Sequence, residues 1–193
     1  MIRKLTKDNC IKYTGLLFED IIALTGITAF HDVKDLMFTE GELDDDIVDI
    51  EFETDCLELL TVRINLRRKT IKNVEIHSTG KIKNIGYQLL SSQIDHARRL
   101  GFKTITLNAF GDPSIKNEYS GFIVWGKLGY QMDDVSQAKF EQLMRSNDRP
   151  EKDLFELLSS KEGKTFWENN GFQWLGEFDL SDHSTSMNCF RNL

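Results

Sequence analysis

The chain has 193 residues and a mass of 22.3 kDa, enough for one hydrophobic core that buries about 70% of the surface of the unfolded chain. Its net charge of −7 and pI of about 5.2 disfavour a nucleic-acid backbone as partner, because such binding requires a concentrated basic face. Since no signal peptide and no apolar span of about 18 residues is found, we expect one cytoplasmic domain over residues 1–193 with no membrane partner.

The first part of the chain is expected to hold a helix and two strands. Apolar side chains recur at helical spacing over residues 6–24, and Gly26 stands where such a helix could stop. The acidic residues 40–46 are interpreted as a solvated loop, or alternatively as a patch that attracts a cationic acceptor. Apolar residues then alternate over residues 48–52 and 60–66, which predicts two half-buried strands that pair antiparallel.

A strand, a helix and a further strand are predicted next. Residues 72–78 continue the alternation, which places Glu75 and His77 on the same face of a third strand. Residues 84–100 carry one apolar stripe and end in two arginines before a glycine, as helices often do. Residues 103–110 alternate again, so the three elements predict a right-handed crossover between parallel strands.

The remaining sequence favours helices over strands. Three helices and one last strand are predicted here, over residues 119–128, 135–158, 164–169 and 172–180 respectively. Cysteines are few, odd in number and widely spaced, which favours reduced thiols over a disulfide framework, and no histidines have metal-ligand spacing. We therefore expect no metal site.

The loop between the third strand and the following helix is the strongest functional signal. It lies within residues 74–86, whose sequence is VEIHSTGKIKNIG. A helix leaves its first N–H groups without partners and carries partial positive charge at its N-terminus, so a strand that ends there directs donors at a phosphate. Lys81 and Lys83 add positive charge. The layout predicts an anion site.

Residues 81–86, KIKNIG, can be compared with a known cofactor loop. Lys81 is basic, Gly86 is small, and Asn84 occupies a position three residues after the lysine. With the order of the surrounding elements, this resembles the GCN5-related N-acetyltransferases, whose loop is written Q/R-x-x-G-x-G/A. Asn84 replaces the first glycine, but asparagine accepts positive φ better than most residues, so the turn can be kept. The resemblance covers roughly residues 46–130 and a final strand.

A second family signature, aromatic-x-Lys-x-Gly-aromatic, occurs twice, once in full and once in part. It is found in WGKLGY at residues 125–130 and in FWENNGF at residues 166–172. We favour the first copy for the helix on the cofactor side, which makes residues 131–163 an insertion. Many family members have a tyrosine here that acts as general acid, whereas this chain has Trp125 and Trp167, whose indoles cannot deliver a proton at neutral pH.

The resemblance implies a fold and a cofactor. The fold is α/β (α+β), with a mixed central sheet of about six to seven strands flanked by helices and a helical insertion near residues 131–163. The cofactor is acetyl-CoA or another acyl-CoA, with its pyrophosphate on the loop and its pantetheine along the preceding strand. The residues implied in cofactor binding are Ile76, Ser78, Lys81, Ile82, Lys83, Asn84, Ile85, Gly86, Tyr87 and Asn108.

Three residues are candidates for proton transfer. Glu75 and His77 are the titratable residues nearest the loop on the strand, and each is alternatively an exposed or ion-paired sheet residue. Tyr119 is the nearest phenol that could replace the missing acid, and is alternatively a packed aromatic. Asn108 is included with the cofactor residues because it ends a predicted parallel strand, where side chains in open α/β sheets often face ligands.

These observations favour an N-acyltransferase that acts on an amine of a small molecule or a protein. The alternative is a catalytically degenerate domain of the same fold that serves as a binding or interaction module. Asn84 and the two tryptophans favour the module, whereas the lysines and Gly86 favour the enzyme. A transferase that acts on charged tRNA is disfavoured by the acidic balance. The sequence leaves a homodimer as a further alternative for the oligomeric state.

Overall fold

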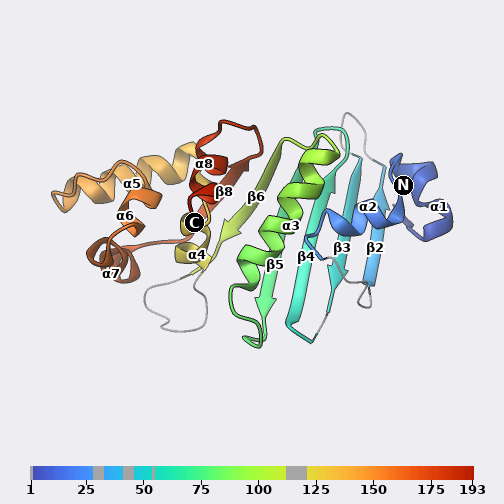
Figure 1. Cartoon of the computed structure of the whole chain (residues 1–193), viewed down its shortest axis with the longest axis horizontal. Helices are drawn as coiled ribbons and strands as arrows, with labels where there is room; N and C mark the ends of the chain where they lie inside the picture. Colours follow the sequence, from blue (N-terminus) through green and yellow to red (C-terminus); the bar gives the residue numbers. More distant parts are fainter. Residues whose placement is uncertain (1, 28–32, 41–45, 54, 112–120) are drawn as a thin grey trace. The chain divides into compact units, whose positions relative to one another are not determined.

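The computed structural model describes residues 2–27, 33–40, 46–53, 55–111 and 121–193 (Figure 1). Contacts divide the chain into two compact units, Met1–Ile105 and Thr106–Leu193, which we describe in turn. The single domain over residues 1–193 stays a prediction. No helix in the described ranges is long and apolar enough to cross a membrane.

The fold is α/β, as predicted, with a central sheet and flanking helices. Within the described residues its strands follow the order β1-β2-β3-β4-β5-β6-β8-β7, which makes eight strands there in place of the six to seven expected. The additional strands include β1 (Ile2–Lys4) and β7 (Gln131–Met132), which have three and two residues. Such short strands cannot display an alternating pattern, so the sequence did not reveal them.

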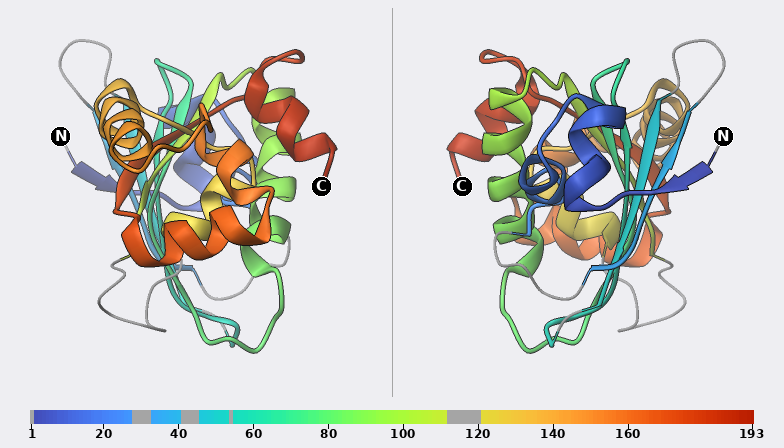
Figure 2. Two further views of the ribbon diagram at one scale, coloured as in Figure 1. Left: turned by 90° about the vertical axis from the view of Figure 1, so that its left-hand side faces the viewer. Right: turned by 90° about the vertical axis from the view of Figure 1, so that its right-hand side faces the viewer.

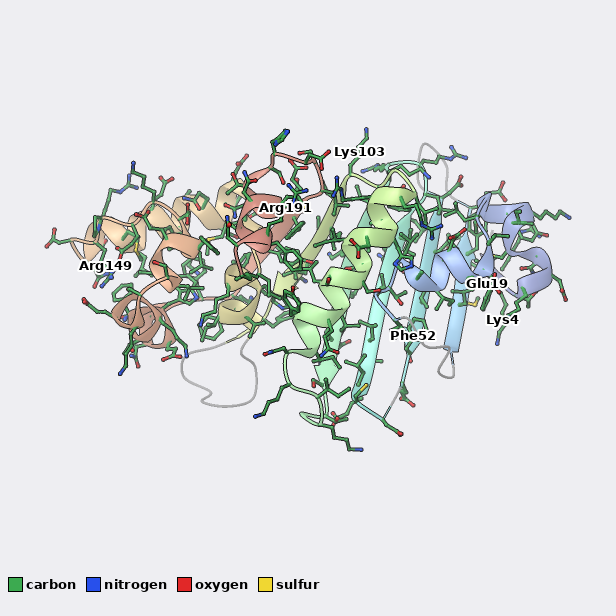
Figure 3. All side chains as sticks on the ribbon, in the orientation of Figure 1. Lys4, Glu19, Phe52, Lys103, Arg149 and Arg191 are labelled. Atoms are coloured by element: carbon green, nitrogen blue, oxygen red, sulfur yellow. The ribbon has the colours of Figure 1, made fainter. Side chains whose placement is uncertain are left out.

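The first unit is built on five antiparallel strands. After β1 these are β2 (Val33–Thr39), β3 (Ile47–Phe52), β4 (Leu57–Asn65) and β5 (Thr70–Ser78). The predicted antiparallel pair is confirmed, with Val48 opposite Ile64 and Ile50 opposite Val62. Side chains on this face are buried, and they include Phe52, which is labelled in Figure 3.

Two short helices precede these strands where one helix was predicted over residues 6–24. They are α1 (Lys7–Thr14) and α2 (Phe18–Ala23). Gly15 ends α1 in the left-handed conformation at φ 71°, and its N–H donates to the carbonyl of Ile11. The apolar spacing continues through this glycine, so the periodicity concealed the break.

The helix α3 (Ile85–Arg99) covers the same face of this sheet as α2 (Figure 2). It agrees with the prediction of a helix over residues 84–100. A buried hydrogen-bond network joins α3 to its neighbours. Asn73 Nδ2 on β5 donates to Gln93 Oε1 at 2.9 Å, and Gln93 Nε2 donates to the Leu24 carbonyl at 2.8 Å. Because each amide is satisfied, the network fixes α3 on β5 at little cost.

The second unit contains the last strands and most of the helices. Its elements after β6 (Thr104–Ala109) are α4 (Gly121–Lys127), β7, α5 (Asp134–Ser146), α6 (Leu154–Leu158), α7 (Lys161–Asn170), β8 (Trp174–Asp179) and α8 (Thr185–Arg191). The helical insertion near residues 131–163 is confirmed, since α5, α6 and the start of α7 lie there. The strand over residues 103–110 and the last strand are also confirmed.

One prediction about the helices of this unit is wrong, and the last helix was not predicted. The helix over residues 135–158 is interrupted between α5 and α6, where Asp148 has φ 50° and Asp153 caps α6. Ser184 caps the last helix, α8, because its Oγ accepts the N–H of Met187 at 3.1 Å. Serine favours turns and helix N-termini alike, so the residue type did not distinguish them.

The insertion contains a largely buried ion pair between Arg149, labelled in Figure 3, and Glu151. Arg149 Nη2 lies 2.5 Å from Glu151 Oε1, and the side chains are 15% and 13% exposed. The guanidinium also lies 4.8 Å from the centre of the Phe166 ring. The hydrogen bond from Arg149 lowers the pKa of Glu151, which means that the folded state favours the charged carboxylate.

We therefore expect the Glu151→Gln variant to lose about 1.5 kcal/mol of stability at pH 7, the lower value for a charged hydrogen bond. A lowered folded-state pKa contributes stability above the pKa of the unfolded state, and that stability disappears as pH falls through the folded pKa. The difference from the parent protein should therefore vanish in acid, as measured by urea unfolding from pH 7 to pH 3. Glu162→Gln is the control, because Glu162 also approaches Arg149 but is 87% exposed. Equal losses in both variants would contradict this account.

Candidate functional site

The loop between β5 and α3, residues 79–84, is the candidate anion site. Asn84 adopts the left-handed conformation at φ 58° and ψ 28°, which asparagine accepts better than most residues. Gly80 also has positive φ, at 75°. The start of the loop is fixed by hydrogen bonds from Gly80 N to Ser78 Oγ at 3.1 Å and from Thr79 N to the Cys56 carbonyl at 3.1 Å.

These bonds change the role expected of the first loop residues. Ser78 Oγ accepts the Gly80 N–H, and the Lys81 N–H approaches Thr79 Oγ1 at 3.4 Å, so both N–H groups have partners inside the loop. Within the described chain no hydrogen bond engages the backbone N–H groups that follow, those of Ile82, Lys83 and Asn84. Donors for an anion therefore begin at Ile82.

The N-terminus of α3 differs from those of the four helices α5 to α8. Asn84 makes no side-chain bond to the helix, and the first turn holds no acidic residue. By contrast, α5, α6, α7 and α8 are each capped by a side chain, from Asp133, Asp153, Ser160 and Ser184 respectively. Lys81 and Lys83 are exposed beside the uncapped end. The helix dipole and two cations thus remain available to an anionic group.

A bulge in β5 determines where the candidate proton acceptors point. Thr61 pairs with Glu75 whereas Val62 pairs with Asn73, so Val74 is an extra residue in β5. An inserted residue reverses the alternation. Asn73 therefore faces α3, while Glu75 lies on the opposite face with His77, as the sequence predicted for the pair.

Glu75 and His77 interact on that face of the sheet. His77 Nε2 lies 3.0 Å from Glu75 Oε1, and both side chains are partly exposed. A carboxylate that accepts the Nε2 proton leaves Nδ1 as the basic nitrogen of the neutral ring. The pair is chemically suited to accept a proton, and it lies on the strand that leads into the loop.

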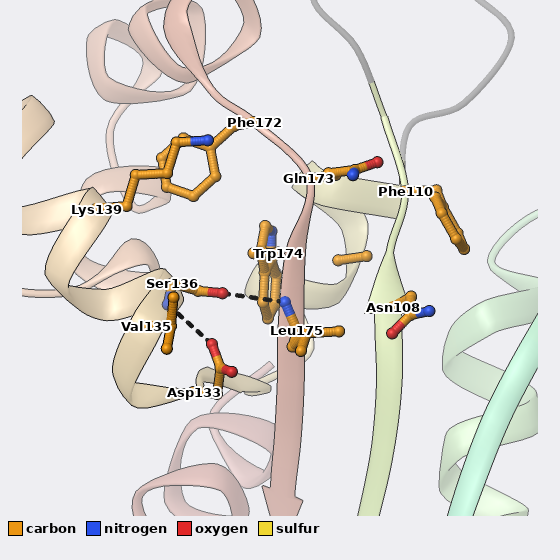
Figure 4. A pocket seen from close by; sticks show the side chains of 11 residues that line it. Asn108, Phe110, Asp133, Val135, Ser136, Lys139, Phe172, Gln173, Trp174 and Leu175 are labelled. Carbon is orange, nitrogen blue, oxygen red and sulfur yellow. Dashed lines mark hydrogen bonds between the residues drawn. The ribbon is translucent and has the colours of Figure 1, made fainter.

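The second unit contains a hollow of about 420 Å³, shown in Figure 4. Side chains from the end of β6, the start of α5 and the start of β8 line it. Asn108, predicted in cofactor binding, is one of them, and its Oδ1 is shielded from solvent and accepts no hydrogen bond within the described chain. An unsatisfied buried acceptor costs about 1–3 kcal/mol.

The tryptophans that occupy the expected acid position are structural. Trp167 is fully buried, and its Nε1 donates to the Phe122 carbonyl at 3.0 Å. Trp174 Nε1 donates to the same carbonyl at 3.0 Å. Trp125 is buried against Tyr130, with ring centres 5.7 Å apart. Tyr119, the proposed replacement acid, lies outside the described residues.

The sequence did not reveal the lining of the hollow contributed by α5 and β8. Three of these residues are Val135, Lys139 and Leu175. Val135 is the second residue of α5 and is exposed although it is apolar. Only the fold brings Val135 to the same hollow as Leu175.

Comparisons with known proteins identify no family for the chain. No family model matches the chain, and no curated protein matches its sequence. Among solved structures, the chain is similar to yncA of Salmonella typhimurium, a candidate acetyltransferase determined with its cofactor acetyl-CoA. The two share 14% sequence identity over 95% of each chain, with a TM-score of 0.24. A TM-score of this size does not establish a common fold.

Proposed function

We propose that the chain is a GCN5-related N-acyltransferase that transfers an acyl group from acetyl-CoA or another acyl-CoA to an amine. The observation that carries this proposal is the uncapped N-terminus of α3, preceded by Asn84 in the left-handed conformation and by two exposed lysines. A pyrophosphate fits this donor set, since it accepts hydrogen bonds from backbone N–H groups and charge from lysines.

The residues of the loop and of β5 have separate tasks in this proposal. The N–H groups from Ile82 onward, with Lys81 and Lys83, hold the pyrophosphate, while Ser78 keeps the loop in shape through its bond to Gly80. When bound, the thioester supplies an activated acyl carbon. The transfer forms an N–C bond on the acceptor and breaks the C–S bond, and the thiolate takes a proton from solvent.

The acceptor amine must lose a proton when it attacks. His77 accepts it, and Glu75 holds the ring and stabilises the imidazolium that results, because the two side chains lie 3.0 Å apart. The backbone of β5 near Ile76 is the proposed partner of the pantetheine. Donors directed at developing oxyanion charge contribute several kcal/mol in such reactions.

Binding of acetyl-CoA is the first test. At one hundred times the dissociation constant the cofactor should stabilise the folded protein by about 2.7 kcal/mol, which raises the thermal midpoint. The variant with Lys81→Ala and Lys83→Ala should bind at least tenfold more weakly, because it loses both cations. Calorimetric titration with acetyl-CoA measures the affinity directly.

The control for this variant replaces two other exposed lysines of the first unit, Lys4 and Lys72, by alanine. This control keeps the net charge change but leaves the loop intact, so its affinity should match that of the parent protein. No binding by the parent at millimolar acetyl-CoA would refute the proposal. Equal weakening in both variants would refute the placement of the pyrophosphate.

A degenerate binding module is the second candidate function. It is favoured by Trp125 and Trp167, since buried indoles replace the general acid of the family and the Trp167 N–H is already engaged. This candidate predicts acetyl-CoA binding without release of free thiol in the presence of an amine panel. Detection of thiol release would exclude it.

A further inference from the structure

The hollow of the second unit has the size and lining of a small-molecule site. Its volume of about 420 Å³ lies within the range of about 300–1,000 Å³ common for ligand pockets. Of the described residues that line it, Lys139 and Asp133 carry charges, and these are opposite in sign. Asp133 Oδ1 already accepts the Ser136 N–H at 2.9 Å, and Lys139 Nζ lies 3.9 Å from the centre of the Phe172 ring. The lining therefore has no net charge.

The walls expose apolar surface that a solvated hollow would not favour. Phe110, Val135 and Leu175 are 47%, 79% and 49% exposed, and all three line it. The Trp174 indole also presents only apolar surface there, because its N–H is bonded to the Phe122 carbonyl. Exposed apolar side chains that gather in one hollow are typical of a binding site.

These walls are held in place by the start of α5. The Leu175 N–H donates to Ser136 Oγ at 3.2 Å, as Figure 4 shows, and the Leu175 carbonyl accepts the Asp133 N–H at 3.0 Å. Both backbone groups of Leu175 are thus satisfied, which fixes its backbone at the rim. The site is formed before any ligand arrives.

The polar feature that selects a ligand is the amide of Asn108. Asn108 lines the hollow, its Oδ1 lacks a partner in the described chain, and its terminal torsion is soft enough for the amide to turn toward a ligand. There it can accept an N–H. We propose that the hollow binds a small primary amine with an aromatic or branched apolar body, which is the acceptor class if the proposed acyltransferase function holds.

The test uses the full chain without acyl-CoA, with 2-phenylethylamine as probe and ethylamine and phenylacetate as comparisons. Titration calorimetry should detect saturable binding of 2-phenylethylamine, and binding of ethylamine and of phenylacetate should be at least tenfold weaker.

The double variant with Val135→Asn and Leu175→Asn makes the rim polar without adding charge, and it should bind 2-phenylethylamine at least tenfold more weakly. Ile11→Asn is the matched control, because Ile11 is also exposed and apolar but lies on α1.

Thermal unfolding verifies that each variant is folded. Asn108→Leu should weaken 2-phenylethylamine binding at least tenfold, because it removes the proposed acceptor. Absence of saturable binding, or equal affinity in the rim variant, would overturn the proposal. Tighter binding of phenylacetate that Lys139→Ala abolishes would also overturn it, in favour of an anion site. Amine binding without acyl transfer would refute the enzyme and keep the site, whereas acetyl-CoA binding without amine binding would refute the site alone.

Discussion

The Gly26→Ala variant is expected to lose more than about 4 kcal/mol of unfolding free energy, a large part of the 5–15 kcal/mol typical of a domain. Gly26 has φ 85°, a conformation that costs other residues about 1–2 kcal/mol. A Cβ atom there would also lie 2.3 Å from the Leu89 carbonyl oxygen. That oxygen belongs to the backbone of α3, so α3 would have to move away.

The Gly15→Ala variant separates the cost of the left-handed backbone conformation from the cost of the steric contact with α3. Gly15 is also left-handed, at φ 71°, but no atom lies within 4 Å of the place that a Cβ atom would occupy. Its loss should be about 1–2 kcal/mol, from the backbone alone. Urea unfolding followed by circular dichroism measures both variants. If the two losses were equal, the contact between Gly26 and α3 would not limit stability.

A displaced α3 should also affect the loop. Leu89 lies little more than one turn after Ile85, the first residue of α3, and the buried Gln93 network lies one turn further. We therefore expect whatever Gly26→Ala protein remains folded to bind acetyl-CoA more weakly, although Gly26 lies outside the proposed site. The stability of the packing and the geometry of the anion site depend on the same helix.

Local patterns predicted the elements that have a long, regular periodicity. The strands β3, β4 and β6 and the helix α3 were found because each buries one face over six or more residues. The break at Gly15 was missed, since an isolated glycine is tolerated within a helix and only its positive φ reveals the turn. Tertiary packing determines that φ.

The two candidate sites differ in how far the sequence predicted them. The candidate anion loop could be predicted as a structural unit because strand, loop and helix are consecutive, and Asn84 has the conformation that its residue type permits. Glu75 and His77 share a face, as their spacing requires, but the bulge at Val74 decides which face. The hollow combines residues 108–110, 133–139 and 172–175, and local sequence carries no signal that brings such distant segments together.

His77→Ala is expected to lower kcat by about 10²–10⁴ if the chain is the proposed acyltransferase, since that is the usual contribution of a positioned general base. The acetyl-CoA affinity should remain unchanged, because His77 lies outside the lysine-bearing loop. Glu75→Gln keeps an acceptor for the Nε2 proton but removes the charge that stabilises the imidazolium, so it should cause a smaller loss.

A second ion pair on the same sheet face supplies the control for this experiment. Arg63 Nε donates to Asp49 Oδ1 at 2.7 Å, and Arg63 follows Thr61, the partner of Glu75, by two residues. Asp49→Asn with Arg63→Gln should leave kcat unchanged, because an exposed pair contributes little and neither residue accepts the proton. Rates from thiol release with acetyl-CoA and a reactive amine distinguish the cases. A His77→Ala enzyme with parental kcat would assign the Glu75 and His77 pair to the sheet surface and require another base.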